Sequence, residues 1–119
     1  MNANTLIQAL GPMLNVPVSP DLYEGKKEIY ITYSYNDESP SLYGDDRPLE
    51  DTAIIQVNLY TPKDYNYMTL KHEIRNYLET LGELTSTRSW LETYTSKTNL
   101  EVTKRHTAFV VNITNFREV

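Results

Sequence analysis

The stretch from Thr52 to Gly82 constrains the fold most, because a strand pattern and a helix pattern follow each other directly. Apolar and polar residues alternate from Thr52 to Thr61, which is typical of an antiparallel strand with one buried face. Pro62 then ends the strand, because proline supplies no N–H to a ladder. The expected apolar face of this strand consists of Ala53, Ile55, Val57 and Leu59.

A helix is expected directly after this strand. Asp64 or Asn66 can cap its start, because a short polar side chain accepts a hydrogen bond from an N–H of the first turn. Gly82 follows the last apolar position, where a residue in the left-handed conformation commonly ends a helix. The helix should pack on the strand through one apolar face, formed by Leu70, Ile74, Tyr77, Leu78 and Leu81.

The flanking sequence predicts the remaining elements. A short helix, capped by Asn4 or Thr5, should end at Gly11-Pro12. Residues 15–27, which include two prolines, form either an ordered connector or an extended edge segment. Further strands are expected at residues 28–36, 83–95 and 100–114, with a hairpin loop at 96–99 and with Thr107, Phe109, Val111 and Ile113 on the core side of the last strand.

These elements follow one another in the order α-β-β-α-β-β. Strands that are consecutive in pairs predict an α+β fold, with a mostly antiparallel sheet and a long helix packed on one face. A chain of 119 residues is expected to form a single domain, residues 1–119. Within it, residues 1–27 form a short N-terminal helix and connector, and residues 28–116 form the core of sheet and helix.

Composition excludes several classes of function. A formal net charge of −5 argues against a general nucleic-acid binder, which needs a basic surface. The chain has no cysteine, so disulfides and thiolate metal sites are excluded. No apolar run has membrane-spanning length, and the N-terminus lacks the layout of a signal peptide. A soluble intracellular protein without a membrane partner is therefore expected.

The segment from Asp37 to Asp51 is the most polar part of the chain. It contains six acidic residues, one arginine, two prolines and one glycine, and these residue types predict a long loop. Loops of this length are more often functional or mobile than idle. The carboxylates could hold a hard cation, but their spacing matches no calcium-loop pattern, so we expect no metal site.

The sequence offers no group to which catalysis can be assigned. His72 falls on the polar side of the expected helix and His106 falls within the last strand, and together they match no metal or triad pattern. The four glycines are scattered singly and form no phosphate-binding loop. We therefore expect no catalytic residue, no metal and no cofactor.

The central part of the chain resembles the tail terminators of long-tailed bacteriophages of Gram-positive hosts, which are also called tail-completion or tail-to-head joining proteins. The residues that carry the resemblance cover most of residues 29–114. They are the aromatic strand from Tyr33 to Asp37, the acidic Gly44-Asp45-Asp46, the strand from Gln56 to Pro62, the start of the helix at residues 64–68, the helix through Lys71 and Arg75 to Gly82, Ser89-Trp90, and the closing strand Val111–Thr114. Glu83 departs from the pattern, where an aromatic or apolar residue would be expected.

The resemblance implies a structural protein of the virion without catalysis. Such proteins form a ring, usually a hexamer, that caps the tail tube and joins it to the head connector. The implied partners are further copies of the chain, the tail tube protein and the head connector or neck protein, while phage DNA passes through the lumen without specific binding. The implied location is the head-proximal end of the tail, and the host cytoplasm during assembly.

Several residues are candidates for the contacts of such a ring. In a cyclic assembly each subunit uses two different patches, so both faces of a thin sheet can be covered. The segment 37–51 is the candidate docking arm. The alternative for each tyrosine is packing within its own subunit. The candidates are Tyr30, Asp37, Glu38, Tyr43, Asp45, Asp46, Arg47, Tyr60 and Tyr65.

Two other functions compete with this interpretation. A head-completion or neck ring protein of the same virion has subunits of similar size and class, and the sequence pattern separates the two poorly. A small acidic ligand-binding domain or enzyme would need convergent polar groups with perturbed ionisation in a concave site. The sequence shows no pair of nucleophile and base that would favour the second alternative.

Overall fold

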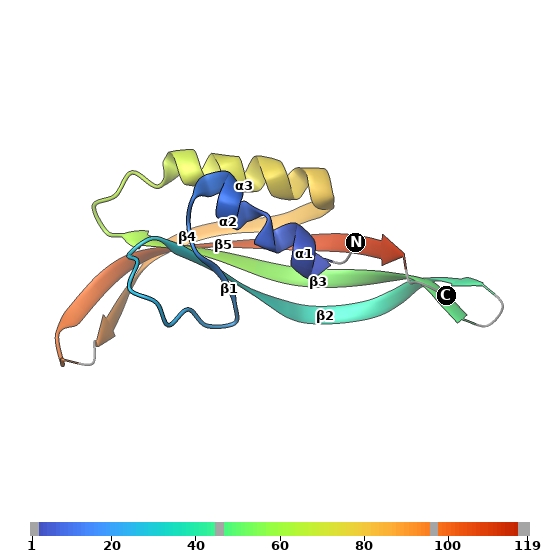
Figure 1. Ribbon diagram of the computed structural model, residues 1–119, viewed down its shortest axis with the longest axis horizontal. Coiled ribbons are helices and arrows are strands. Elements are labelled where there is room, and N and C mark those ends of the chain that lie inside the picture. Colours follow the sequence, from blue (N-terminus) through green and yellow to red (C-terminus); the bar gives the residue numbers. More distant parts are fainter. Residues whose placement is uncertain (1–2, 45–46, 96–97, 117–119) are drawn as a thin grey trace.

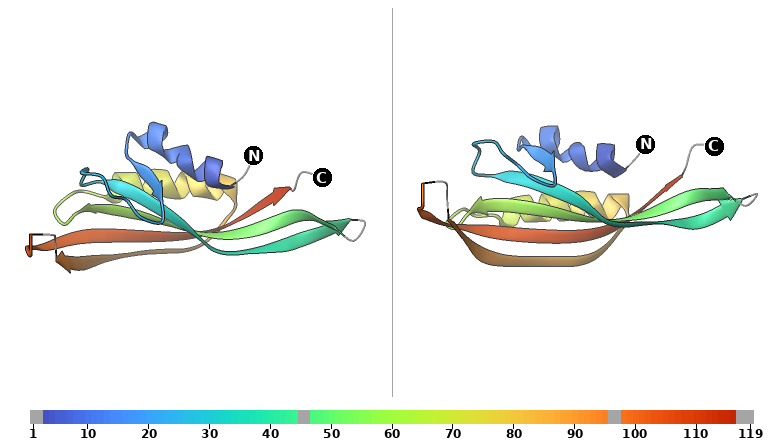
Figure 2. Two further views of the ribbon diagram at one scale, coloured as in Figure 1. Left: turned by 60° about the horizontal axis from the view of Figure 1, so that its bottom comes forward. Right: turned by 90° about the horizontal axis from the view of Figure 1, so that it is seen from below.

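Five strands form one twisted sheet, and the described helices all lie on one side of it (Figures 1 and 2). The computed structural model describes residues 3–44, 47–95 and 98–116, and it describes the side chains of these residues except 37–44, 47–51, 115 and 116. The elements, in chain order, are α1 Ala3–Gln8, α2 Leu10–Leu14, β1 Val18–Pro20, β2 Tyr30–Gly44, β3 Arg47–Pro62, α3 Met68–Leu81, β4 Glu83–Thr95 and β5 Glu101–Phe116.

The order of strands across the sheet is β1-β2-β3-β5-β4. β1 runs parallel to β2, and the other three neighbouring pairs are antiparallel. The α+β class, the mostly antiparallel sheet and the packing of a helix on one face are therefore as predicted, but α3, with 14 residues, is shorter than the long helix that was expected. The expected order of elements is wrong at the N-terminus, where two short helices and an extra strand precede β2.

Prolines explain both differences at the N-terminus. Pro12 does not end a helix, because it lies in the first turn of α2, where a backbone N–H has no partner within the helix. Pro17 and Pro20 belong to the edge of the sheet, where a missing N–H is tolerated. The carbonyl of Pro17 accepts a hydrogen bond from the N–H of Ile31, and residues 18–20 form the edge strand β1. Residues 21–29 connect β1 to β2, so the segment contains both an extended edge and a connector.

The two ends of α3 differ from each other in how well they were predicted. The N-cap residue is Tyr67, which makes no side-chain capping bond, and the N–H of Met68 donates instead to Oδ1 of Asn66, one residue earlier, at 3.3 Å. Gly82 follows the last helical residue as expected, but its φ of 179° is extended, so the expected left-handed conformation is wrong. The glycine is needed for space instead: a Cβ at this position would lie 2.0 Å from the carbonyl oxygen of Asn112 on β5.

The apolar core lies between the sheet and the helices. The alternating residues of β3 predicted to face the core are fully buried, as are those of β5, which confirms both strand faces. Ile74 and Leu78 of α3 and Ile7 and Leu10 of the N-terminal helices cover them. The hydroxyl of Tyr77 donates to the carbonyl of Leu6 at 2.7 Å and so links α3 to α1.

The strands extend far beyond this core. The expected loop at 37–51 is wrong, because β2 continues to Gly44 and β3 starts at Arg47, and the two pair as one long hairpin. Backbone hydrogen bonds between two strands do not require apolar side chains, so a polar sequence can continue the ladder. Pro40 lies beside a register shift, in the part of β2 that extends past its pairing with β1, where a proline is tolerated.

The contact at Gly82 can be tested by adding a single methyl group. Gly82→Ala is expected to destabilise the fold by about 1–3 kcal/mol, because a backbone oxygen cannot move aside without disturbing the β4–β5 pairing. Urea unfolding followed by circular dichroism measures the change. Gly11→Ala is the matched control: its Cβ would meet nothing closer than 3.5 Å, and alanine favours a helix by up to about 1 kcal/mol. Equal losses in both variants would contradict the close-approach explanation.

Candidate functional site

A row of stacked rings crosses the face of the sheet opposite the helices, which we call the helix-free face. Tyr30 on β2, Tyr60 on β3, His106 on β5 and Trp90 on β4 are direct cross-strand neighbours. Their ring centroids are 4.9 Å apart for Tyr30–Tyr60, and 4.4 Å for both Tyr60–His106 and Trp90–His106. Tyr23, from the β1–β2 connection, stacks on Tyr30 at 4.6 Å. These five residues form what we call the aromatic row.

The alternation of the strands places this row on the face that the core does not use. Leu59 and Thr107 point to the core, so their neighbours Tyr60 and His106 point to the opposite face. Cross-strand aromatic pairs of this kind stabilise a sheet. Tyr30 and Tyr60 have a stacked ring on each face, so these two rings present mainly their edges to a ligand or partner. Trp90 is tilted by 45° against His106 and does not stack on it.

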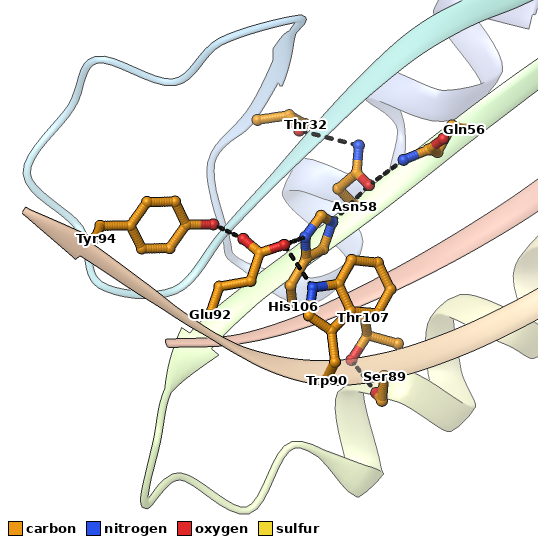
Figure 3. Close-up of polar contacts among 9 residues, drawn as sticks. All are labelled: Thr32, Gln56, Asn58, Ser89, Trp90, Glu92, Tyr94, His106 and Thr107. Carbon is orange, nitrogen blue, oxygen red and sulfur yellow. Dashed lines mark hydrogen bonds and ion pairs between the residues drawn. The ribbon is translucent and has the colours of Figure 1, made fainter. Parts of the chain in front are cut away.

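A hydrogen-bond network surrounds His106 on this face (Figure 3). His106 is only 7% exposed, and its Nδ1 lies 2.9 Å from Oε1 of Glu92. Its Nε2 lies 2.7 Å from Oδ1 of Asn58, whose Nδ2 donates to Thr32 at 3.4 Å. The ring is therefore held from both sides by oxygen atoms of β4 and β3.

Glu92 is the acceptor on which this network converges. Its Oε1 accepts the indole N–H of Trp90 at 2.5 Å as well as bonding His106, and its Oε2 accepts the hydroxyl of Tyr94. Gln56 donates to Oδ1 of Asn58 at 2.8 Å on the far side of the imidazole. The carboxylate thus satisfies three donors whose side chains come from β4 and β5.

The network is suited to holding the sheet together rather than to chemistry. A histidine beside a carboxylate resembles part of a catalytic triad, but a base needs a nitrogen that is free to reach a nucleophile or a substrate. Here neither ring nitrogen of His106 is free, because Glu92 and Asn58 hold one each. Within the described residues, no His, Asp and Glu cluster of three or more is placed to hold a metal ion.

Two tyrosine hydroxyls sit in environments that disfavour their ionised form. Burial raises the pKa of Tyr60, and the negative charge of Glu92 and the neighbouring Tyr30 raise it further, while a hydrogen bond from Thr32 acts in the opposite direction. Burial also raises the pKa of Tyr77 under the N-terminal helix. Both tyrosines therefore hold their protons more tightly in the folded state than in the unfolded chain.

The structure places the predicted contact residues at three different locations. Tyr30 and Tyr60 lie in the aromatic row and contact rings of their own subunit, while Tyr65 is 42% exposed between β3 and α3. The backbones of Asp37, Glu38, Tyr43 and Arg47 lie on the long β2–β3 hairpin, and their side chains are outside the described set. Asp45 and Asp46 lie outside the described residues altogether.

Sequence reasoning missed most of the polar network. The sequence places His106 in the last strand, but it indicates no role for Glu92 or Asn58. The alternation in β3 and β5 could have placed Asn58, Tyr60 and His106 on one face. Their pairing with Trp90 and Glu92 depends on the strand register, which the sequence does not specify.

Comparisons with known proteins leave the family open. No protein-family model matches the sequence, and no curated protein matches it. One solved chain superposes over the full length of both proteins with 11% identity and a TM-score of 0.47, a similarity too low to support a shared fold or function. Among the described helices, none combines the length and apolar character needed to cross a membrane.

Removing the shared acceptor should destabilise the sheet. Glu92→Ala leaves the donors of Trp90, His106 and Tyr94 without their carboxylate, and we expect a loss of about 1–3 kcal/mol in the free energy of unfolding. The matched control is Glu79→Ala, which removes an exposed partner of Arg75 and should cost about 0.5 kcal/mol or less. Urea unfolding of both variants measures the difference. A similar small loss in both would show that the network contributes little.

The raised pKa of Tyr60 predicts a pH dependence at alkaline pH. Below the usual tyrosine pKa of about 10, Tyr60 is protonated in both the folded and the unfolded protein, so its full contribution to the free energy of unfolding is present. As the pH rises through the raised pKa, the unfolded chain releases its proton first, so stability is lost. Tyr60→Phe should flatten this alkaline decline, whereas Tyr65→Phe, at an exposed position, should leave it unchanged. Unfolding free energies measured between neutral and strongly alkaline pH give the two slopes, and equal slopes would refute the assignment.

Proposed function

We propose that this protein is a ring-forming tail terminator of a long-tailed bacteriophage, which caps the tail tube and joins it to the head connector without catalysis. The proposal combines the sequence resemblance with a feature of the fold that a small soluble domain does not need. That feature is the length of its strands. Strands this long extend past the core at both ends, and we infer that these ends contact other subunits.

The strands β2, β3, β4 and β5 contain 15, 16, 13 and 16 residues, whereas about 5–6 is common in globular proteins. The helices cover only the middle of the sheet, and hairpins project at both ends of the molecule, which measures 57 × 28 × 24 Å (Figures 1 and 2). At the β4–β5 end, where Thr93, Tyr94 and Glu101 are exposed, the strand that extends past the core gains little burial from its own subunit. This length is the observation that carries the proposal.

The β4–β5 end also exposes apolar side chains. Tyr94 and Val102 are cross-strand partners, each 39% exposed, and Leu91 and Leu100 are 48% and 65% exposed. Strand alternation places Tyr94 and Val102 on one face and Leu91 on the other, so apolar groups are exposed on both faces of this hairpin. Exposed apolar groups of this kind can contact another protein. The hairpin at the opposite end is acidic in sequence. Two different ends suit a ring, in which each subunit contacts its neighbours through different patches.

The charge of the chain fits the passage of DNA through such a ring. The formal net charge is −5, and basic groups around a lumen would hold phosphates by displacing their counterions. An acidic or neutral lumen lets DNA pass. Tyr30 and Tyr60 are stacked between other rings, so they can contact a neighbouring subunit only through their ring edges. Tyr65 is exposed and can make such a contact more freely.

The proposal is tested by locating the protein in the virion. Electron microscopy of phage particles and isolated tails, labelled with a specific antibody, should show label confined to the head-proximal end of the tail. Label on the head side of the joint would favour a neck or head-completion protein, and label along the whole tail would indicate a tube subunit. Absence of label from all particles would overturn the structural role. A tail fibre antibody serves as the control for access of label to the particle.

A further inference from the structure

A small pocket opens beside the aromatic row, where the β1–β2 connection meets the sheet. Its volume is about 160 Å³, and a cavity of roughly 150 Å³ can hold one benzene molecule. The size therefore suits a compound of roughly six to nine non-hydrogen atoms. We call it the tyrosine pocket, and the lining residues that bear on binding are Asp21, Leu22, Tyr23, Tyr30, Tyr60 and Lys104.

Lys104 on β5 brings a positive charge into this lining. Glu92 is its direct cross-strand neighbour, but the carboxylate of Glu92 bonds His106 instead. The ammonium group of Lys104 donates to the hydroxyl of Tyr30 at 3.1 Å and lies 5.0 and 5.8 Å from the ring centroids of Tyr30 and Tyr94. Within the described residues it forms no ion pair. An ammonium group has three N–H donors, so two remain for a ligand.

The tyrosine hydroxyls of the lining add further donors. Each of them already accepts a hydrogen bond: Tyr23 accepts a backbone N–H at 3.0 Å, and Tyr30 accepts the ammonium of Lys104. Tyr60 accepts a hydrogen bond from Thr32. A hydroxyl that accepts one bond still has its own proton to donate. Together with the ammonium group, these hydroxyls suit a carboxylate, which accepts several hydrogen bonds at once.

Asp21 contributes the opposite charge from the β1–β2 connection. Its backbone is left-handed, with a φ of 59°, and its N–H donates to the carbonyl of Tyr33 at 2.8 Å. The hydroxyl of Ser19 donates to the carbonyl of Leu22 at 3.0 Å and so holds the turn around Asp21. The carboxylate is exposed, and it pairs neither with Lys104 nor with another cation among the residues that the structure describes.

The pocket therefore presents two opposite charges that do not neutralise each other. Asp21 and Lys104 are the charged residues of its lining, whereas the charged residues at positions 24 and 26–28 of the same connection do not belong to it. A plain carboxylate would be repelled by Asp21, and a plain amine would be repelled by Lys104. A molecule with one group of each kind can meet an opposite charge on both sides.

We propose that the tyrosine pocket binds a small amino acid, which carries one carboxylate and one ammonium group on a short apolar frame. Its carboxylate accepts hydrogen bonds from Lys104 and the tyrosine hydroxyls, and its ammonium group pairs with Asp21. Leu22, which is 66% exposed, and the edges of the tyrosine rings offer apolar contacts to the frame. This site goes beyond the proposed ring, and it needs no second copy of the chain.

Two probes with matched controls test the need for both charges. Leucine carries its charged groups on one carbon, and δ-aminovalerate carries them at the two ends of its chain. Isocaproate and valerate lack the ammonium group, and isoamylamine and butylamine lack the carboxylate. In ¹H–¹⁵N NMR titrations of the full-length protein, at least one probe should shift the amide signals of Leu22 and Tyr23 saturably, with a dissociation constant of about 1 mM. Its two controls should bind at least about tenfold more weakly.

Substitutions assign the two charges to their residues. Lys104→Met removes the ammonium group and keeps an apolar stem, and Asp21→Asn removes the negative charge while tolerating the left-handed backbone. Each should weaken binding of the probe by at least about tenfold. The matched controls, Lys71→Met and Asp64→Asn, should bind like wild type. Lys71 is also half-buried and lies over a ring, that of Tyr67, and Asp64 is also exposed, but both are outside the pocket.

Each outcome decides for or against the site. If neither probe gives a saturable shift, the inference is wrong. It is also wrong if the compounds that lack one charge bind as tightly as the probe, or if folded Lys104→Met or Asp21→Asn protein keeps full affinity. Thermal unfolding checks the fold of each variant, and the comparison of compounds on wild type decides where a variant does not fold. Antibody labelling of virions tests the proposed function separately, so either proposal can fail alone.

Discussion

The antiparallel pairing of β3 with β5 is the interaction on which the rest of the structure depends. The register sets Val57 opposite Phe109 and Tyr60 opposite His106. The first pair faces the helices and builds the apolar core, and the second pair belongs to the aromatic row on the opposite face. A slip of one residue would exchange the two faces along a whole strand, placing rings in the core and aliphatic groups in solvent. One register therefore fixes both layers of the molecule.

The residues that alternate most cleanly were the ones whose structure the sequence predicted. In β3, β5 and α3 the period of the apolar residues agrees with burial, because one face of each element is covered by the core. Prediction failed at residues 37–51, where Pro40, Pro48 and the acidic residues indicate a loop but backbone pairing with neighbouring strands continues the sheet. It failed also at Gly82, where a contact with Asn112 across the sheet, and not a local helix ending, requires glycine. The contact at Gly82 joins residues distant in sequence, whereas the hairpin pairs residues close in sequence whose residue types are typical of a loop.

The aromatic row and the network around His106 could not be predicted for the same reason. Trp90 and Glu92 reach His106 only because β4 returns beside β5 in one register, with a shift near Leu84 that is accommodated before the ring contacts begin. Once formed, the network engages both ring nitrogens of His106 within the sheet. Beside it, a pocket opens next to the aromatic row, with Tyr30, Tyr60 and Lys104 in its lining. Accessible surface for a ligand or a partner therefore lies next to the row as well as on the β4–β5 hairpin, where apolar groups are exposed.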